Sequence, residues 1–94
     1  MDDSGPVDLA RLPSRIDVLP RQGGEKLRPG VRARTQSLKK LLQGARMPVD
    51  MRARIPLLFA GKRLIAAGDR WIDASIAATV KSRRRARLKW TPGN

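Results

Sequence analysis

Apolar residues after Ser37 repeat at the spacing of one face of an α-helix. The repeating residues are separated by three, four and seven positions: Leu38, Leu41, Leu42 and Ala45. The other side is basic and polar: Lys39, Lys40 and Gln43. The hydroxyl of Ser37 or Thr35 can cap the start, and Gly44 suits the end. The pattern predicts a short amphipathic helix whose leucines pack on a core.

A second short helix is predicted from Pro48 to about Arg54. Proline is favoured at the start of a helix because the N–H that it lacks is not needed there. Pro56 cannot continue the helix, so the segment ends before it. Met51 and Ile55 would face the core. The residues expected to face water or a ligand are both basic: Arg52 and Arg54.

Short strands are predicted on both sides of these helices. Residues 15–19 alternate in polarity up to Pro20, which cannot donate to a strand ladder. The apolar run 57–60 is typical of a buried strand, and residues 64–67 would return as its partner. Two further strands are expected: 71–72 and 86–90. The predicted fold class is α+β, a small mixed sheet of short strands with two short helices packed on it.

The chain divides into a tail and one domain. Residues 1–13 are small, acidic and aperiodic, which is typical of a disordered tail or linker. Residues 14–92 have the length of one small domain with a modest core. The sequence contains no internal repeat.

Charge is the strongest compositional signal. The formal net charge of the 94 residues is +13. Residues 1–20 hold four acidic and two basic residues, whereas residues 21–94 hold nineteen basic and four acidic ones. A polyanion is therefore the expected partner, nucleic acid first and an anionic membrane surface second. No stretch approaches the length of a transmembrane helix.

Composition also argues against catalysis by this chain alone. The chain has no His and no Cys, so the commonest general base and the usual soft metal ligands are missing. The remaining acids form no recognisable acid/base pair. We therefore expect no cofactor in this chain. The absence of Cys fits a cytoplasmic protein.

A paired glycine turn has two interpretations. Residues 21–25 read Arg-Gln-Gly-Gly-Glu, and paired glycines can present bare amides as an anion-holding concavity. The same pair is also typical of an ordinary turn between two strands. Glu25 is expected to hold this turn by pairing with a nearby Arg.

Three other features need weighing. Gly61-Lys62 lacks the earlier glycine of a phosphate-binding loop, because position 56 is Pro. The basic run 81–87 is either a phosphate-contact patch or a solvated loop. Trp71 and Trp90 could stack on bases, but their apolar neighbours favour the core.

The motifs occur in a fixed order between about residues 15 and 90. They are Arg21-x-Gly-Gly-Glu25, Ser37-Leu-Lys-Lys-Leu-Leu-Gln43, Pro48 with Arg52-x-Arg54-x-Pro56-Leu57-Leu58, Gly61, and Ala66 with Trp71-Ile72-Asp73. This ordered set resembles the C-terminal domain of bacterial tRNA(Ile)-lysidine synthase. The chain departs from that pattern at Val49-Asp50, where the family often has an aromatic residue.

The resemblance implies a parent ligase that adenylates C2 of the wobble cytidine of tRNA(Ile) with ATP and Mg. Lysine then displaces AMP. The family's catalytic N-terminal domain carries a Ser-Gly-Gly-x-Asp-Ser motif, which does not occur in this chain. The resemblance therefore implies a non-catalytic domain whose partners are tRNA(Ile), notably its acceptor stem, and the N-terminal catalytic domain of the parent enzyme.

Charge and resemblance together predict the RNA contacts. A duplex RNA is recognised mainly through shape, phosphates and 2′-hydroxyls, which suits a surface rich in Arg and Lys. The candidate RNA-binding residues are Arg21, Lys26, Arg28, Arg32, Arg34, Lys39, Lys40, Arg52 and Arg54. The alternative is a free-standing basic structural protein that binds nucleic acid non-specifically, such as a nucleoid or ribosome component.

Overall fold

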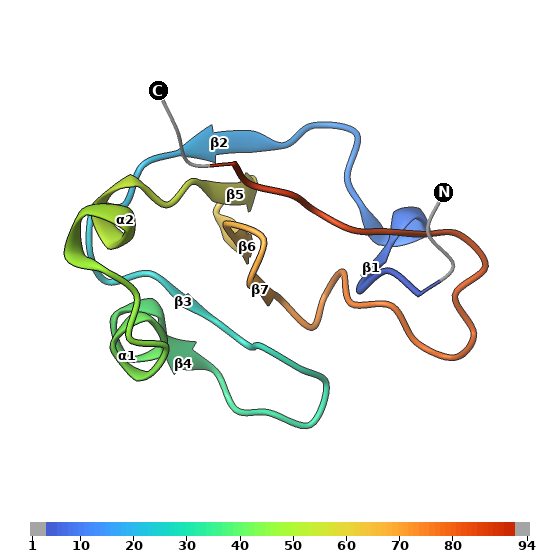
Figure 1. Cartoon of the computed structure of the whole chain (residues 1–94). Helices are drawn as coiled ribbons and strands as arrows, with labels where there is room; N and C mark the ends of the chain where they lie inside the picture. The colour runs from blue at the N-terminus through green and yellow to red at the C-terminus, as the bar shows by residue number, and fades with distance from the viewer. Residues whose placement is uncertain (1–3, 92–94) are drawn as a thin grey trace.

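Figure 1 shows the computed structural model, which describes residues 4–91. Its elements in chain order are β1 (Val7–Asp8), the 3-10 helix η1 (Leu9–Arg11), β2 (Asp17–Leu19), β3 (Lys26–Leu27), β4 (Gln36–Ser37), α1 (Leu38–Gly44), α2 (Val49–Arg54), β5 (Leu57–Ala60), β6 (Arg63–Ala67), β7 (Trp71–Ile72) and β8 (Arg85–Ala86). Short antiparallel strands with two α-helices confirm the α+β fold class.

A four-stranded antiparallel sheet forms the centre, in the order β2-β5-β6-β7. Leu57 of β5 pairs with Leu19 of β2 on one side and with Ala67 of β6 on the other. Two smaller sheets, β3-β4 and β1-β8, flank it. At the turn after β6, Gly68 has φ +56°, and a Cβ there would come within 3.0 Å of Ile55. A side chain at this turn would therefore be strained and crowded.

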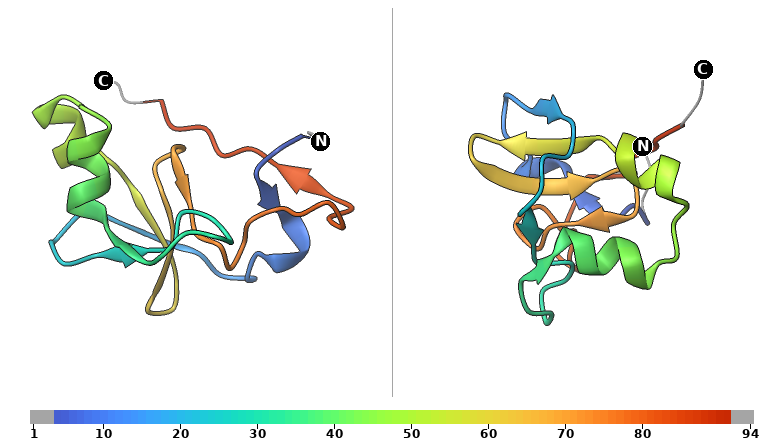
Figure 2. Two further views of the ribbon diagram at one scale, coloured as in Figure 1. Left: turned by 90° about the horizontal axis from the view of Figure 1, so that it is seen from below. Right: turned by 90° about the vertical axis from the view of Figure 1, so that its left-hand side faces the viewer.

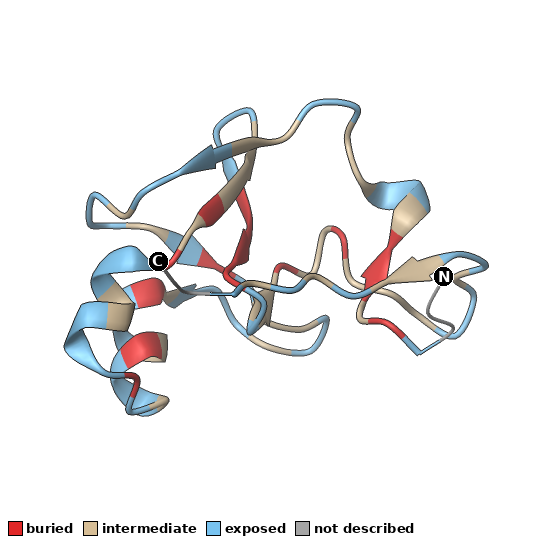
Figure 3. Ribbon diagram, turned by 45° about the horizontal axis from the view of Figure 1, so that its top comes forward, coloured by how far each residue is buried: buried red, intermediate tan, exposed pale blue. Residues whose placement is uncertain are grey.

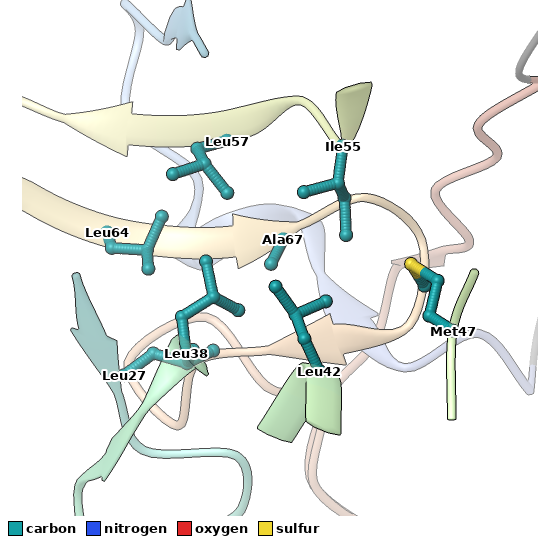
Figure 4. Close-up of a cluster of buried hydrophobic side chains, with 8 residues drawn as sticks. All are labelled: Leu27, Leu38, Leu42, Met47, Ile55, Leu57, Leu64 and Ala67. Carbon is teal, nitrogen blue, oxygen red and sulfur yellow. The ribbon is translucent and has the colours of Figure 1, made fainter. Parts of the chain in front are cut away.

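The central sheet is covered on both faces. Figure 4 shows the larger cluster, which we call the Leu38 cluster, in which Leu38 and Leu42 of α1 approach the sheet. A second cluster, which we call the Val7 cluster, is built on Val7, Ile65 and Ile76 and covers the other face. Figure 3 shows separate buried stretches in α1, in the central strands and in β1, whereas most of the connecting loops are exposed or half-buried. Burial on both faces explains why residues 57–60 are uninterruptedly apolar.

Helix α1 follows its predicted pattern. The Ser37 hydroxyl accepts a hydrogen bond from the Lys40 N–H at 3.1 Å, so Ser37 is the cap. Leu38 and Leu42 are 0% and 1% exposed. Gly44 is the last helical residue, but the backbone turns left-handed two residues later, at Arg46 with φ +54°.

The predicted disordered tail over residues 1–13 is wrong where β1 forms. Val7 is 0% exposed and pairs with Ala86 of β8. Gly5 packs so closely on the Ala86 carbonyl that no Cβ would fit. The Asp8 carboxylate accepts from the Ser82 hydroxyl at 2.8 Å, which is the chief reason that the pKa of Asp8 is lowered. A two-residue strand has no periodicity, so the pattern could not reveal it; residues 1–3 lie outside the described residues.

The predicted closing strand 86–90 is also mostly wrong. Only Arg85–Ala86 pairs, and its partner is β1. Beyond it, Leu88 packs on the Val7 cluster and Trp90 on the Leu38 cluster, while the Trp90 N–H donates to the Asp69 carboxylate at 3.1 Å. Because successive apolar side chains of this irregular segment enter two different clusters, apolar and polar residues alternate in it as they would in a strand.

Both tryptophans are half-buried against the Leu38 cluster, as predicted. Within residues 4–91, no helix has the length and apolarity needed to cross a membrane.

Candidate nucleic-acid interface

A hairpin carries the basic segment that follows the glycine turn. Lys26 pairs with Ser37 and Leu27 with Gln36. Leu27 is 2% exposed and anchors β3 in the larger core, so its neighbours Lys26 and Arg28 are left exposed. Strand β3 lies against β6 (Figure 2). The hairpin thereby sets its cations beside the β5–β6 turn.

Asp73 fastens the root of this hairpin to the segment after β7. Its carboxylate accepts from the Arg28 N–H at 2.8 Å, the Ser75 N–H at 3.0 Å and the Ser75 hydroxyl at 2.6 Å. The Ala74 N–H returns a bond to the Arg28 carbonyl at 2.8 Å. Burial raises the pKa of Asp73, but these hydrogen bonds outweigh burial and leave the pKa below its usual value.

Two adjoining pockets of about 410 and 430 Å³ lie over this junction, and we call them together the basic groove. They share four lining residues: Arg28, Thr35, Arg63 and Asp73. The first pocket adds Lys26 and Lys62, and the second adds Arg11 and Ser75. Within residues 4–91, the ion pairs are Arg11 with Asp8 and Arg15 with Asp17, so the other groove cations lie outside any ion pair of this part of the chain.

The predicted RNA contacts do not all gather in this groove. Lys26 and Arg28 line it. Arg32 and Arg34 are exposed in the loop that joins β3 to β4. The remaining exposed candidates belong to the helices: Lys39 and Lys40 on α1, and Arg54 at the end of α2.

Arg21 and Arg52 are less exposed than the other candidates. Both are half-buried, and an Arg21 Nη donates to the Arg52 carbonyl at 3.4 Å. The Nε atoms of both side chains are shielded from solvent without a hydrogen-bond partner. Arg52, which was expected to face water or a ligand, is therefore only partly open to either, whereas Arg54 is exposed.

The glycine turn is closed by its own carboxylate. Gly23 and Gly24 have φ of +108° and +81°. The Glu25 carboxylate accepts from the Gln22 N–H at 2.8 Å and the Gly23 N–H at 3.1 Å. Glu25 holds the turn as expected, but through backbone amides rather than through an Arg. The amides of this concavity are thus already occupied by an internal anion.

The sequence prediction missed three groove cations: Arg11, Lys62 and Arg63. Lys62 and Arg63 follow Gly61 in a tight turn, where charge is usual and gives no signal. Only the packing of β3 beside β6 brings them to the groove. Within residues 4–91, no three His, Cys, Asp or Glu side chains gather where they could hold a metal ion.

These features define a small basic α+β domain that brings cations from separate chain segments to one groove. The chain belongs to the family of TilS substrate C-terminal domains, whose family model matches residues 16–90. This match confirms the resemblance to the C-terminal domain of tRNA(Ile)-lysidine synthase.

The chain is similar to three curated relatives, each called tRNA(Ile)-lysidine synthase. It is 40% identical to that of Xanthomonas campestris pv. campestris (strain 8004) over 80 residues, covering 85% of this chain and 18% of the relative. The Ralstonia nicotianae protein is 40% identical over 74 residues, covering 77% of this chain and 16% of the relative. That of Coxiella burnetii is 49% identical over 53 residues, covering 56% and 12%. The chain thus spans less than a fifth of these relatives. No solved structure matches it.

Proposed function

We propose that this domain binds tRNA(Ile) and helps to hold its acceptor stem while the catalytic domain of a parent ligase modifies the wobble cytidine. Family membership supports the tRNA as substrate, since the matched relatives are named tRNA(Ile)-lysidine synthase. We extend the tRNA substrate in the name of those relatives to this chain as part of the proposal.

The basic groove is the observation that carries the proposal. Its walls bring together cations that are far apart in the sequence, beside an exposed basic loop with Arg32 and Arg34. A-form RNA is bound largely through its phosphates and 2′-hydroxyls. The groove residues offer guanidinium, ammonium and hydroxyl donors for such contacts, whereas Trp71 and Trp90 pack on the core.

The chemistry would belong to another part of the parent enzyme. Among residues 4–91, the groove gathers one carboxylate among cations, which is a poor donor set for Mg with ATP. ATP, Mg and lysine would therefore be handled by the N-terminal catalytic domain, in the cytoplasm. This domain would contribute affinity and orientation.

Binding to three nucleic acids tests the proposal. Folded tRNA(Ile), an acceptor-stem minihelix and a random DNA duplex of the minihelix length are titrated with the domain at low and physiological salt. We expect tRNA(Ile) and the minihelix to stay ahead of DNA at physiological salt. If all three bind alike and dissociate together as salt rises, the charge is generic. That result would favour the free-standing nucleic-acid-binding protein.

A further inference from the structure

We propose that the basic groove is a phosphate-binding site in which Lys62 and Arg63 of the β5–β6 turn act together with Arg28 of the hairpin. The site rests on the proposed function for the source of its phosphate, which is an RNA. It assigns a role to two residues that neither the charge pattern nor the family motifs indicate.

The groove cations converge from separate parts of the chain. Arg28 follows β3, Lys62 and Arg63 precede or begin β6, and Lys26 faces them from the hairpin. Like charges repel one another, so such a cluster is costly unless an anion joins it. Within residues 4–91 no carboxylate forms an ion pair with Lys26, Lys62 or Arg63. The charge of Arg63 does act on the Asp73 carboxylate, but this one carboxylate lines a groove with several cations. An anion from outside the domain would balance the remaining charge.

Asp73 offsets this charge only in part. It is 7% exposed, and its two oxygens already accept from the Arg28 N–H, the Ser75 N–H and the Ser75 hydroxyl. Its carboxylate lines both pockets and acts on Arg63 through its charge, but it forms no ion pair with Arg63 or Lys62. Asp73 is therefore a positioning residue that fixes the backbone of Arg28, and the side chains of Lys62 and Arg63 can still bind an anion.

The donors fit a phosphate better than a base. Arg28 uses its guanidinium on the Gly30 carbonyl, at 3.2 Å, and on the Val31 carbonyl, which leaves further N–H groups of its five unused. Thr35 adds a hydroxyl, and no aromatic side chain lines either pocket. A stacking platform is thus missing, while arginine and lysine are the usual phosphate ligands.

The size of the groove narrows the source of the phosphate. A pocket of about 410 Å³ has room for a phosphate with its sugar, but not for a duplex. The phosphate is then either an internal phosphodiester that protrudes from the RNA surface or a terminal 5′-phosphate. Both have the same chemistry, so the experiment must separate them.

A matched pair of double variants tests the site. Lys62→Ala/Arg63→Ala removes two groove cations, and the control Arg70→Ala/Lys89→Ala removes one arginine and one lysine that are exposed and line neither pocket of the groove. Affinity for the acceptor-stem minihelix is measured between low and physiological salt. We expect the groove variant to bind about tenfold more weakly at physiological salt, with a salt slope reduced by roughly 0.7–0.9 for each lost contact. The control variant should stay within about twofold of the parent domain.

Equal losses from both variants would overturn the proposal, because total charge alone would then explain binding. No loss from the groove variant would overturn it too. If the parent domain does not prefer the minihelix over DNA at physiological salt, the proposed function fails instead. A minihelix with a 5′-hydroxyl identifies the source. If the parent domain binds the 5′-hydroxyl minihelix more weakly than the 5′-phosphate one, and Lys62→Ala/Arg63→Ala binds both alike, the groove holds the terminal phosphate. If the parent domain binds both minihelices alike and the groove variant binds both more weakly, the groove holds an internal phosphate.

Discussion

The N–H of Arg28 donates to the carboxylate of Asp73 at 2.8 Å, across 45 residues of sequence. This bond joins the root of the basic hairpin to the end of the central sheet. The same carboxylate also binds Ser75, so one acid holds two backbone segments together. The position of the groove therefore depends on a buried acid within a strongly basic chain.

Replacing Asp73 should weaken the domain. Asp73→Ala leaves the Arg28 N–H and both Ser75 donors without their acceptor, and a buried unsatisfied donor costs about 1–3 kcal/mol. We expect the free energy of unfolding in urea to fall by about 2–3 kcal/mol. Asp73→Asn should cost less, since its amide oxygen can still accept. The control is Asp50→Ala at an exposed position, expected below about 1 kcal/mol. A loss for Asp73→Ala no larger than for this control would contradict the assignment.

Stability should depend on this acid at low pH. The pKa of Asp73 is lower in the folded protein than its ordinary value of 3.8. A lowered pKa contributes stability that is fully present above the unfolded pKa and is lost as pH falls through the folded pKa. We expect the stability difference between the parent domain and Asp73→Asn to be constant above about pH 5 and to shrink below about pH 4. Urea unfolding at a series of pH values measures it. A difference that stays constant down to about pH 2 would show that the charge of Asp73 does not stabilise the fold.

The first strand should be as important as a core element. Val7 is 0% exposed, so Val7→Ala leaves a cavity, and we expect about 2 kcal/mol of destabilisation. Val80 is 97% exposed and provides the matched control, since Val80→Ala removes the same atoms from water. Thermal unfolding compares the two variants. If both melt alike, residues 7–8 contribute little, and the stably folded domain begins later in the chain.

The outer side of α1 should contribute charge to RNA binding. Lys39 and Lys40 are exposed on a helix whose buried side is held by Leu38 and Leu42. Reversing both to Glu should therefore weaken binding to tRNA(Ile) without unfolding the domain. Affinity is measured at physiological salt, and circular dichroism checks the fold. Unchanged affinity of a folded double variant would remove this helix from the interface.

Local patterns predicted the local elements. The leucine spacing predicted α1, prolines bounded α2, and the apolar run 57–60 predicted β5. These features depend on neighbours within a few residues, which the sequence displays directly.

The groove could not be predicted in the same way. Lys62 and Arg63 meet Arg28 only because β3 packs beside β6. Charge alone also did not indicate burial, since Arg21 and Arg52 are basic residues of the family motifs and are half-buried. A formal charge does not say whether an arginine stem packs on the protein or reaches a ligand.

The pairing of Val7 with Ala86 has a consequence for the order of folding. Helix α1 and the β5–β6 hairpin can form from neighbouring residues, but β1 pairs with residues far along the chain: Val7 bridges Ala77 and also pairs with Ala86. Closing so long a loop is entropically costly, and non-local pairs of this kind slow folding. During synthesis the sheet would thus remain uncovered on its Val7 side until residues 76–86 have emerged from the ribosome and joined β1.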